Sequence, residues 1–267
     1  MNAATTLING RPGDQVCASE RALHYGDGLF ETISCLDGRP RWLDLHLQRL
    51  RKGCERLQLP FDAHAALAHE VALLAEGQPR CIVKVIVSRG RATRRGYRPS
   101  GEERPTRIVS RHEWPPDADG AGLRVGISAV RLGSNALLAG LKHLNRLEQV
   151  LAQLQRPADA DEVLMLSGTQ QVISGSMSNV FFADQDGLFT PDLRECGVEG
   201  VMRRVVLAAA GGVAVRPVAA AELAGVREAF MTNVRWGVRS VALLDGRALP
   251  GDDYARQLRR LIDGAAV

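Results

Sequence analysis

A ten-residue segment rich in proline, glycine and acidic residues divides this chain, and it constrains the fold more than any other feature. It reads EWPPDADGAG from Glu113 to Gly122, a composition that favours neither helix nor strand. On each side of it, helical and strand-like patterns are mixed without strict alternation, so a doubly wound parallel sheet is not indicated. The sequence therefore predicts an α+β protein with two domains, residues 1–114 and 123–267, and a linker at about 115–122.

Periodicity predicts the main elements of each domain. Apolar residues at helical spacing predict a helix over 41–59, which ends before a proline, and a second helix around 67–77. A β-branched run predicts the clearest strand at 81–90. A further helix is predicted at 143–155, immediately after Lys142. The other predicted strands and helices are 29–36, 123–130, 162–166, 180–183, 188–190, a helix after 200, 213–218, 229–233, 240–244 and a helix at 252–262.

Composition excludes several classes of protein. Apolar residues make up 45% of the 267 residues, charged residues 24%, and the mean hydropathy is -0.09, values typical of a globular chain rather than a disordered one. The longest weakly polar stretch, 205–215, contains two glycines and is far shorter than the roughly 20 apolar residues of a membrane-spanning helix. The first residues lack the basic and apolar regions of a secretory signal, so we expect a cytoplasmic protein without membrane contact.

Cysteine and charge patterns argue against a metal centre and against nucleic acid. The five cysteines are scattered, with no CxxC pair and no histidine at ligand spacing, so we expect reduced, buried thiols and no metal. The net charge is only +4 and aromatic residues make up 4%. One arginine cluster at 89–98 leaves nucleic-acid binding open as a remote alternative, but no nucleic-acid module surrounds it.

Lysine is scarce, because only Lys52, Lys84 and Lys142 occur among the 34 basic residues. A chain that uses arginine wherever charge suffices keeps lysine for chemistry that a guanidinium cannot perform, such as imine formation or proton transfer. Lys52 falls on the polar face of a predicted helix, and Lys84 falls within a predicted strand. Lys142 follows a glycine at the start of an amphipathic pattern, where a side chain can project into a cleft. We therefore favour Lys142 as the reactive amine and keep Lys84 as its competitor.

A second feature suits an anion. The segment GVEGVMR, residues 197–203, places glycines before a predicted helix whose first amides include those of Val201 and Met202. Such amides bind phosphate at a helix start, although glycine before a helix is equally typical of a plain loop. Arg49, on another predicted helix, would supply a bidentate cation. A reactive lysine, a phosphate-binding helix start and an arginine together match the needs of pyridoxal phosphate.

Six motifs then carry a family resemblance. In chain order they are RALHYGDGLFET (21–32), HLQRL (46–50), VSRGRATRRGY (87–97), VRLGSNALLAGLKHLNRLEQVLA (130–152), VISGSMSNVF (172–181) and TPDLRECGVEGVMRR (190–204). The chain resembles the fold type IV pyridoxal-phosphate enzymes, and its KHLNRLEQVL segment resembles the aminodeoxychorismate lyases among them. This resemblance implies a two-domain α+β fold with a C-terminal pseudo-barrel, and conversion of 4-amino-4-deoxychorismate to 4-aminobenzoate and pyruvate in folate synthesis.

The resemblance also implies roles for single residues. Lys142 corresponds to the lysine that binds the cofactor covalently and acts in catalysis, whereas Lys84 corresponds to a structural lysine. The implied cofactor-binding residues are Arg49, Lys142, Ser174, Asn179, Val201, Met202 and Asn233, with phosphate contacts at Arg49, at the amides of Val201 and Met202, and near Asn233. The implied substrate contacts are Thr32, Arg95 and Tyr97. A homodimer is implied in the same way.

One position departs from the family pattern. Where the family has a glutamate that keeps the pyridine nitrogen protonated, this chain has Ser174. A serine hydroxyl cannot hold a proton on that nitrogen as a carboxylate does. Transamination depends on a strongly electron-withdrawing ring, whereas the lyase reaction gains from forming an aromatic product. We therefore interpret Ser174 as specialisation for the lyase reaction, with a D-amino-acid or branched-chain aminotransferase, or a catalytically silent relative, as alternatives.

Overall fold

A computed structural model describes residues 5–116 and 122–264, and it separates into two compact units. The first unit comprises Met1–Pro116 and Leu141–Asn145, and the second comprises Asp117–Gly140 and Arg146–Val267. Most of the predicted linker, residues 117–121, lies outside the described residues. The short segment Leu141–Asn145, which the sequence placed in the second domain, belongs to the first unit. It does so because its backbone bonds to a strand there: the Phe30 amide donates to the Lys142 carbonyl at 2.9 Å.

The first unit is built on a six-stranded sheet in the order β2-β1-β6-β5-β3-β4. All its pairings are antiparallel, and the long central strands β3 and β5 pair over their full length. On β5, Val83, Val85 and Val87 are buried on one face, whereas Lys84 lies half-buried on the other. The strands are β1 (Thr6–Ile8), β2 (Arg11–Pro12), β3 (Gly28–Leu36), β4 (Arg39–Pro40), β5 (Arg80–Ser88) and β6 (Thr106–Glu113).

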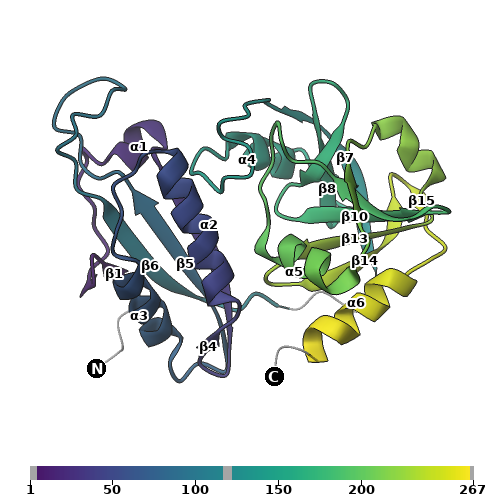
Figure 1. Ribbon diagram of the computed structural model, residues 1–267, viewed down its shortest axis with the longest axis horizontal. Coiled ribbons are helices and arrows are strands. Elements are labelled where there is room, and N and C mark those ends of the chain that lie inside the picture. The colour runs from purple at the N-terminus through teal and green to yellow at the C-terminus, as the bar shows by residue number, and fades with distance from the viewer. Residues whose placement is uncertain (1–4, 117–121, 265–267) are drawn as a thin grey trace. The chain divides into compact units, whose positions relative to one another are not determined.

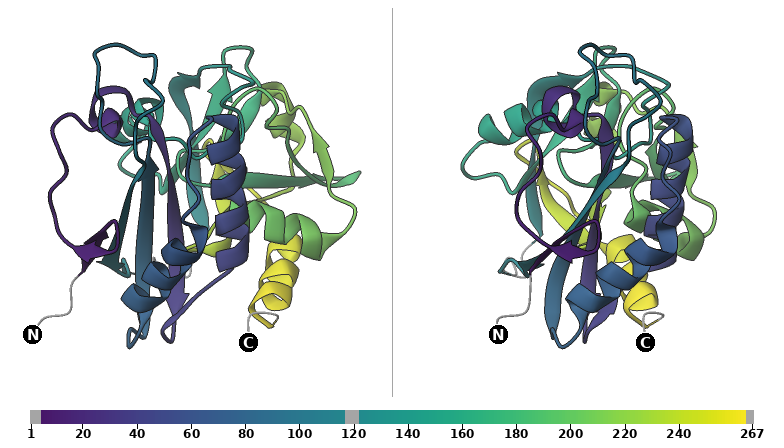
Figure 2. Two further views of the ribbon diagram at one scale, coloured as in Figure 1. Left: turned by 60° about the vertical axis from the view of Figure 1, so that its left-hand side comes forward. Right: turned by 90° about the vertical axis from the view of Figure 1, so that its left-hand side faces the viewer.

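Two helices cover one face of this sheet, as Figures 1 and 2 show. They are α2 (Leu43–Arg56) and α3 (His64–Ala75), and a one-turn helix α1 (Arg21–Tyr25) precedes β3. Leu50 and Cys54 of α2 and Leu67 and Val71 of α3 are buried against the sheet, which fits their helical spacing in the sequence. The helix predicted at 41–59 is therefore present over a shorter range.

The second unit is built on a nine-stranded mixed sheet in the order β12-β11-β10-β13-β14-β7-β8-β9, with β15 paired to β14. Only three residues separate the end of β9 from the start of β10, although these strands stand well apart in the sheet order. A linker of that length reaches only about 10 Å, so the sheet curls back on itself. Its strands are β7 (Leu123–Leu132), β8 (Glu162–Ser167), β9 (Val172–Gly175), β10 (Asn179–Asp184), β11 (Gly187–Pro191), β12 (Ala214–Arg216), β13 (Glu228–Asn233), β14 (Gly237–Leu244) and β15 (Arg247–Ala248).

Three α-helices and one short 3-10 helix accompany the second sheet. They are α4 (Leu147–Leu154), α5 (Val201–Ala210), α6 (Asp253–Gly264) and η1 (Ala220–Gly225). In Figure 1, α5 and α6 lie beside each other near β13 and β14. The helix predicted at 143–155 begins only at Leu147, because residues 141–145 are extended and bond to β3 instead. No helix within the described residues is long and apolar enough to cross a membrane.

Candidate active site

Lys142 lies on an irregular segment that is held by backbone bonds to the start of β3. The Phe30 amide donates to its carbonyl at 2.9 Å, and the Leu144 amide donates to the Gly28 carbonyl at 3.0 Å. Its amine lies 4.2 Å from the centre of the Phe30 ring. The side chain is half-buried. This arrangement fixes the backbone of the lysine while leaving its amine on a partly open face of the sheet.

The same face of β3 carries two further polar side chains. Thr32 is half-buried, points to the same side as Phe30, and pairs across the sheet with Lys84. The Lys84 amine lies 5.6 Å from the centre of the Phe30 ring. We call Phe30, Thr32, Lys84 and Lys142 the lysine patch. The sequence pattern kept Lys84 as a competitor of Lys142 and the family resemblance gave it a structural role, so neither predicted two amines near one ring.

The opposite face of β3 carries a buried ion cluster formed with α2. Arg49 donates from Nε to Glu31 Oε1 at 2.8 Å and from Nη2 to Oε2. His46 Nδ1 lies 2.6 Å from Glu31 Oε2. Burial opposes ionisation of Glu31, but the charge of Arg49 and the hydrogen bonds from Arg49 and His46 outweigh it and lower its pKa to about 2. The arginine predicted to bind phosphate is thus held bidentately by a buried carboxylate.

His46 completes this cluster as a neutral base. Burial lowers its pKa, and this effect exceeds the opposing attraction of Glu31. A neutral ring donates one N–H, here Nδ1–H to Glu31, and keeps the other nitrogen as an acceptor. Its buried Nε2 has no hydrogen-bond partner among the described residues. The hydrogen bond from His46 therefore holds the Glu31 carboxylate in place, and that carboxylate in turn orients Arg49.

The second unit supplies the start of α5. Gly200 is the N-cap of this helix, and the side chains of Val201 and Met202 are buried. The first amides of an α-helix have no acceptor within the helix and carry its positive end. Asn179, the first residue of β10, bonds the preceding turn through both ends of its amide: Nδ2 donates to the Val198 carbonyl at 3.0 Å, and Oδ1 accepts from the Gly200 amide at 3.1 Å. The structure thus engages Asn179 with the turn before the helix.

A buried hydroxyl that the sequence did not indicate belongs to the same region. Thr232 of β13 pairs directly with Asn179, is 1% exposed, and its Oγ1 has no hydrogen-bond partner among the described residues. A lone hydroxyl among the apolar residues of this strand is the one signal that could have identified it. The neighbouring Asn233, predicted near the phosphate, accepts from the Arg235 amide at 3.0 Å and from the Trp236 amide at 2.8 Å within its own turn. We call Asn179, Val198, Gly200, Thr232 and the amides of Val201 and Met202 the helix-entry cluster.

Ser174 and the predicted substrate contacts lie in distinct settings. Ser174 is buried on β9, and its hydroxyl donates to the Gly175 carbonyl at 2.8 Å. Arg95 and Tyr97 lie on an exposed loop, with the Tyr97 ring 5.3 Å from that of Tyr25. Arg21 donates to the Tyr97 carbonyl at 2.7 Å and anchors this loop. The loop therefore has a fixed base and freely exposed side chains.

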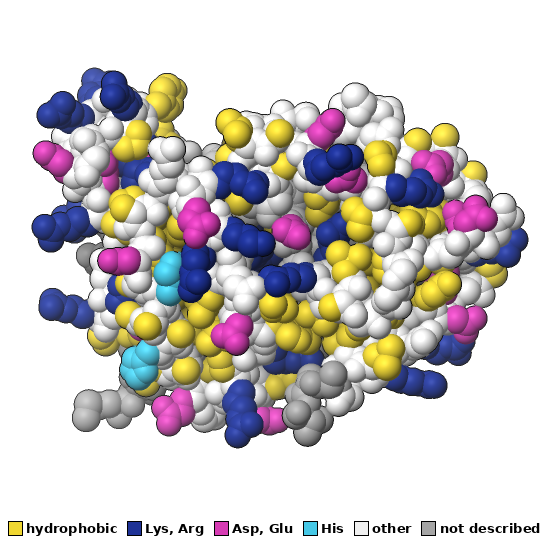
Figure 3. All heavy atoms as spheres, viewed as in Figure 1, with side chains coloured by type: hydrophobic (Ala, Val, Ile, Leu, Met, Phe, Trp, Pro, Cys, Tyr) yellow, Lys and Arg dark blue, Asp and Glu magenta, His cyan; other side chains and the backbone are white. Residues whose placement is uncertain are grey.

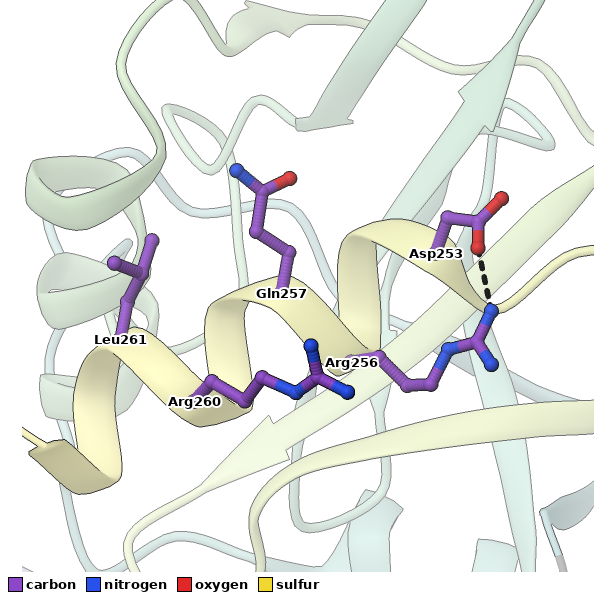
Figure 4. A pocket seen from close by; sticks show the side chains of 5 residues that line it. All are labelled: Asp253, Arg256, Gln257, Arg260 and Leu261. Carbon is purple, nitrogen blue, oxygen red and sulfur yellow. Dashed lines mark hydrogen bonds and ion pairs between the residues drawn. The ribbon is translucent and has the colours of Figure 1, made fainter.

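Other candidate surfaces offer less chemistry. Figure 4 shows a pocket along α6 that is lined only by that helix, with Arg256 bonded to Asp253. Figure 3 shows basic and acidic side chains interspersed on the face in view, and not one basic patch. This face gives no support to the nucleic-acid alternative, since binding to a phosphate backbone calls for clustered positive charge.

Comparison with known proteins identifies the family. The amino-transferase class IV model matches residues 28–244, so the chain belongs to this family, and its fold is the type IV fold that the sequence predicted. Aminodeoxychorismate lyase from Vibrio harveyi is 34% identical over 244 residues, which cover 88% of this chain and 89% of that protein.

Two further relatives show which activities occur in the family. The crystal structure of 4-amino-4-deoxychorismate lyase from Pseudomonas aeruginosa has a TM-score of 0.92 and 40% identity, covering 97% of this chain and 98% of that one. A bifunctional aminodeoxychorismate lyase and D-amino acid transaminase from Mycobacterium tuberculosis is 29% identical over 278 residues, covering 94% of this chain and 93% of that protein. Both lyase and transaminase activities therefore occur among relatives of similar length.

Proposed function

We propose that this protein is a pyridoxal-phosphate-dependent lyase that converts 4-amino-4-deoxychorismate to 4-aminobenzoate and pyruvate. The observation that carries the proposal is Lys142, whose backbone is fixed on β3 and whose amine stands on the half-open face beside Phe30. Similarity to two lyases at 34% and 40% identity, over most of each chain, supports this activity over transamination.

The residues present fit the phosphate of the cofactor. A phosphate needs several N–H or O–H donors and a positive charge. The helix-entry cluster offers the first amides of α5 and the buried, unpartnered hydroxyl of Thr232. In the first unit, Glu31 orients the Arg49 guanidinium, which the family resemblance assigns to the phosphate. When bound, pyridoxal phosphate supplies an aldehyde that reacts with amines and a ring that withdraws electrons from the carbon to be deprotonated.

Lys142 is the proton carrier in this proposal. With the cofactor bound, the Lys142 amine would act as the general base that removes the proton from C4 of the substrate ring. Loss of that proton and cleavage of the neighbouring C–O bond expel the enolpyruvyl group and leave an aromatic ring. The same amine, now protonated, returns the proton to the departing group, which becomes pyruvate. No water or other reactant is needed for the atoms to balance.

The two amines of the lysine patch match the negative charge of the substrate. Aminodeoxychorismate carries two carboxylates, and the patch places two amines, those of Lys84 and Lys142, near one ring. Thr32 adds a hydroxyl on the same face. We propose that Lys84 attracts a substrate carboxylate while Lys142 acts on the ring, and that Thr32, Arg95 and Tyr97 provide further substrate contacts.

Ser174 separates this reaction from transamination. Its hydroxyl proton is engaged by the Gly175 carbonyl, so its oxygen offers a neutral acceptor and no negative charge. A weaker electron demand from the cofactor is tolerable where the product is aromatic, because aromatisation itself drives proton loss. We further propose a homodimer in the cytoplasm, which the family resemblance and the sequence respectively support.

The test of this function is the Lys142→Ala variant. We expect the wild-type protein to bind pyridoxal phosphate in a form that borohydride traps on Lys142, seen by peptide mass spectrometry, and to release equimolar 4-aminobenzoate and pyruvate. The variant should lose the trapped adduct and at least a thousandfold in rate, because general-base and covalent roles are both removed. Lys52→Ala, on an exposed helix position, is the matched control.

Two outcomes would contradict the proposal. If Lys142→Ala keeps the adduct or the lyase rate, another amine performs the chemistry. If the wild-type protein instead transfers an amino group from an amino acid to a keto acid faster than it forms 4-aminobenzoate, the aminotransferase alternative holds.

A further inference from the structure

A buried carboxylate in the second unit collects an unusual number of donors outside the lysine patch. Glu162, the first residue of β8, is 0% exposed. Its Oε1 accepts from the Ser176 amide at 3.2 Å and from the Ser176 hydroxyl, and its Oε2 accepts from the Ser178 hydroxyl at 2.9 Å and from the Met177 amide at 3.3 Å. Glu162 therefore binds every residue of the turn that joins β9 to β10.

This turn ends at Asn179, whose amide holds the turn before α5. Both polar ends of Asn179 are used, one by the Val198 carbonyl and one by the Gly200 amide. Gly140 also binds the turn before α5. Its amide donates to the Gly197 carbonyl at 2.9 Å, and its carbonyl accepts from the Glu199 amide at 3.1 Å. Hydrogen bonds thus connect Glu162 to the 176–178 turn, which leads directly into Asn179, and connect Asn179 to the amide of Gly200, the N-cap residue of α5.

Two glycines make this set possible. A Cβ at Gly200 would collide with Asn179 Oδ1, although the Gly200 backbone angles (φ -66°, ψ 142°) suit any residue. A Cβ at Gly175 would collide with Ser178 Oγ and lie 3.0 Å from Glu162 Oε2. Glycine is therefore required at 175 by the close Ser178 and Met231 side chains and at 200 by the close Asn179 side chain, and not by backbone conformation.

We propose that Glu162 and Asn179 are positioning residues for the phosphate end of the cofactor site. Glu162 fixes the 176–178 turn, the turn fixes Asn179, and Asn179 fixes the amides of Val201 and Met202 in the orientation that a phosphate requires. Neither side chain contacts the cofactor in this arrangement. The inference rests on the proposed function, because it assumes that α5 receives the phosphate.

The experiment compares two ligands that differ only in the phosphate. Affinities for pyridoxal phosphate and for pyridoxal are measured by absorbance with the wild-type protein and the Asn179→Ala variant. We expect Asn179→Ala to lower the affinity for pyridoxal phosphate at least tenfold and to change the affinity for pyridoxal less than twofold. The reason is that only binding of the phosphate group depends on the α5 amides. Ser128→Ala, which removes another buried hydroxyl in the same unit, should leave the ratio of the two affinities unchanged.

Gly200→Ala provides a second and sharper readout. In the wild-type background its new methyl group should displace the Asn179 amide and lower the affinity for pyridoxal phosphate by a similar factor. In the Asn179→Ala background the obstacle is absent, so the double variant should bind pyridoxal phosphate within twofold of Asn179→Ala alone. Additive losses would overturn the proposal, because they would show that the two residues do not act through one contact.

Other outcomes are equally decisive. An equal loss of affinity for both ligands in Asn179→Ala would mean that Asn179 contacts the ring. An unchanged ratio of the two affinities would mean that the hydrogen bonds of Asn179 have no effect on phosphate binding. If Asn179→Ala fails to fold, Ser178→Ala, which removes one hydroxyl from Glu162, should shift the ratio in the same direction by a smaller factor, and no shift would overturn the proposal. If the wild-type protein itself forms no trapped adduct, the proposed function fails instead.

Discussion

Glu31 shows how one residue connects folding with the site. It lies on the buried face of β3 and joins that strand to α2 through Arg49 and His46. Removing one partner from such a cluster leaves an uncompensated buried charge, which costs several kcal/mol. The orientation of Arg49 and the docking of α2 therefore depend on the same carboxylate.

Glu31→Gln should lower stability in a pH-dependent way. The pKa of Glu31 is depressed from 4.5 to about 2 by Arg49 and His46 against the effect of burial. The stabilisation is therefore fully present above pH 4.5 and is lost as the pH falls toward 2, with a magnitude on the order of 3 kcal/mol. Urea unfolding at pH 7 and pH 3 should show a wild-type advantage that shrinks at pH 3.

A matched control is Asp44→Asn, which neutralises an exposed carboxylate on the same helix and should change stability by less than about 1 kcal/mol. A Glu31→Gln deficit of the same size at both pH values would show that packing, and not ionisation, accounts for the effect of Glu31.

At the scale of elements, α4 exposes an apolar stripe. Leu147, Val150, Leu151 and Leu154 recur at helical spacing and are 76%, 49%, 47% and 76% exposed. An apolar stripe of this kind on a single chain is typical of a subunit contact. We infer that this stripe contributes to the homodimer that the family resemblance implies.

Leu154→Glu should therefore weaken dimerisation at least tenfold, because a carboxylate would be buried at the contact without a partner. Sedimentation at micromolar concentrations measures this change. Leu261→Glu makes the same substitution at an exposed leucine of α6, 49% exposed, and should leave the dimer intact. A dimer that survives Leu154→Glu, or a monomeric wild-type protein, would refute this surface.

Several helices and strands lie where their sequence patterns predicted them, but the start of α4 does not. The 3.6-residue periodicity located α2, α3 and α6, and β-branched runs located β5 and β8, because local patterns reflect which face is buried. The same reasoning began the helix after Lys142 four residues too early. The segment before Leu147 instead bonds to β3, more than one hundred residues away, through the Lys142 carbonyl and the Leu144 amide.

Across the whole molecule, the five cysteines report on integrity of the fold. All are free, and burial raises the pKa of Cys35 and Cys54 to about 12 and that of Cys196 to about 11. Burial also raises the pKa of Cys81. Cys17 differs, because hydrogen bonds from Ser19 lower its pKa.

A disulfide reagent at pH 8 should therefore modify one thiol rapidly in the native protein and five after denaturation, since the thiolate is the reactive form. Cys17→Ser should abolish the rapid phase. Rapid modification of two or more thiols in the native protein would contradict the burial of the other four.

The sequence by itself predicted the two-part α+β organisation, the family, and candidate roles for Lys142, Arg49 and the glycine-rich helix start, because these predictions depend on residue type and local spacing. Only the tertiary structure placed Lys84 and Lys142 near the same Phe30 ring, bound Arg49 to Glu31, left the Thr232 hydroxyl without a hydrogen-bond partner among the described residues, and joined Glu162 to the turn before Asn179. Each of these relations connects side chains that are distant in the chain, and no local pattern encodes which strands and helices pack together.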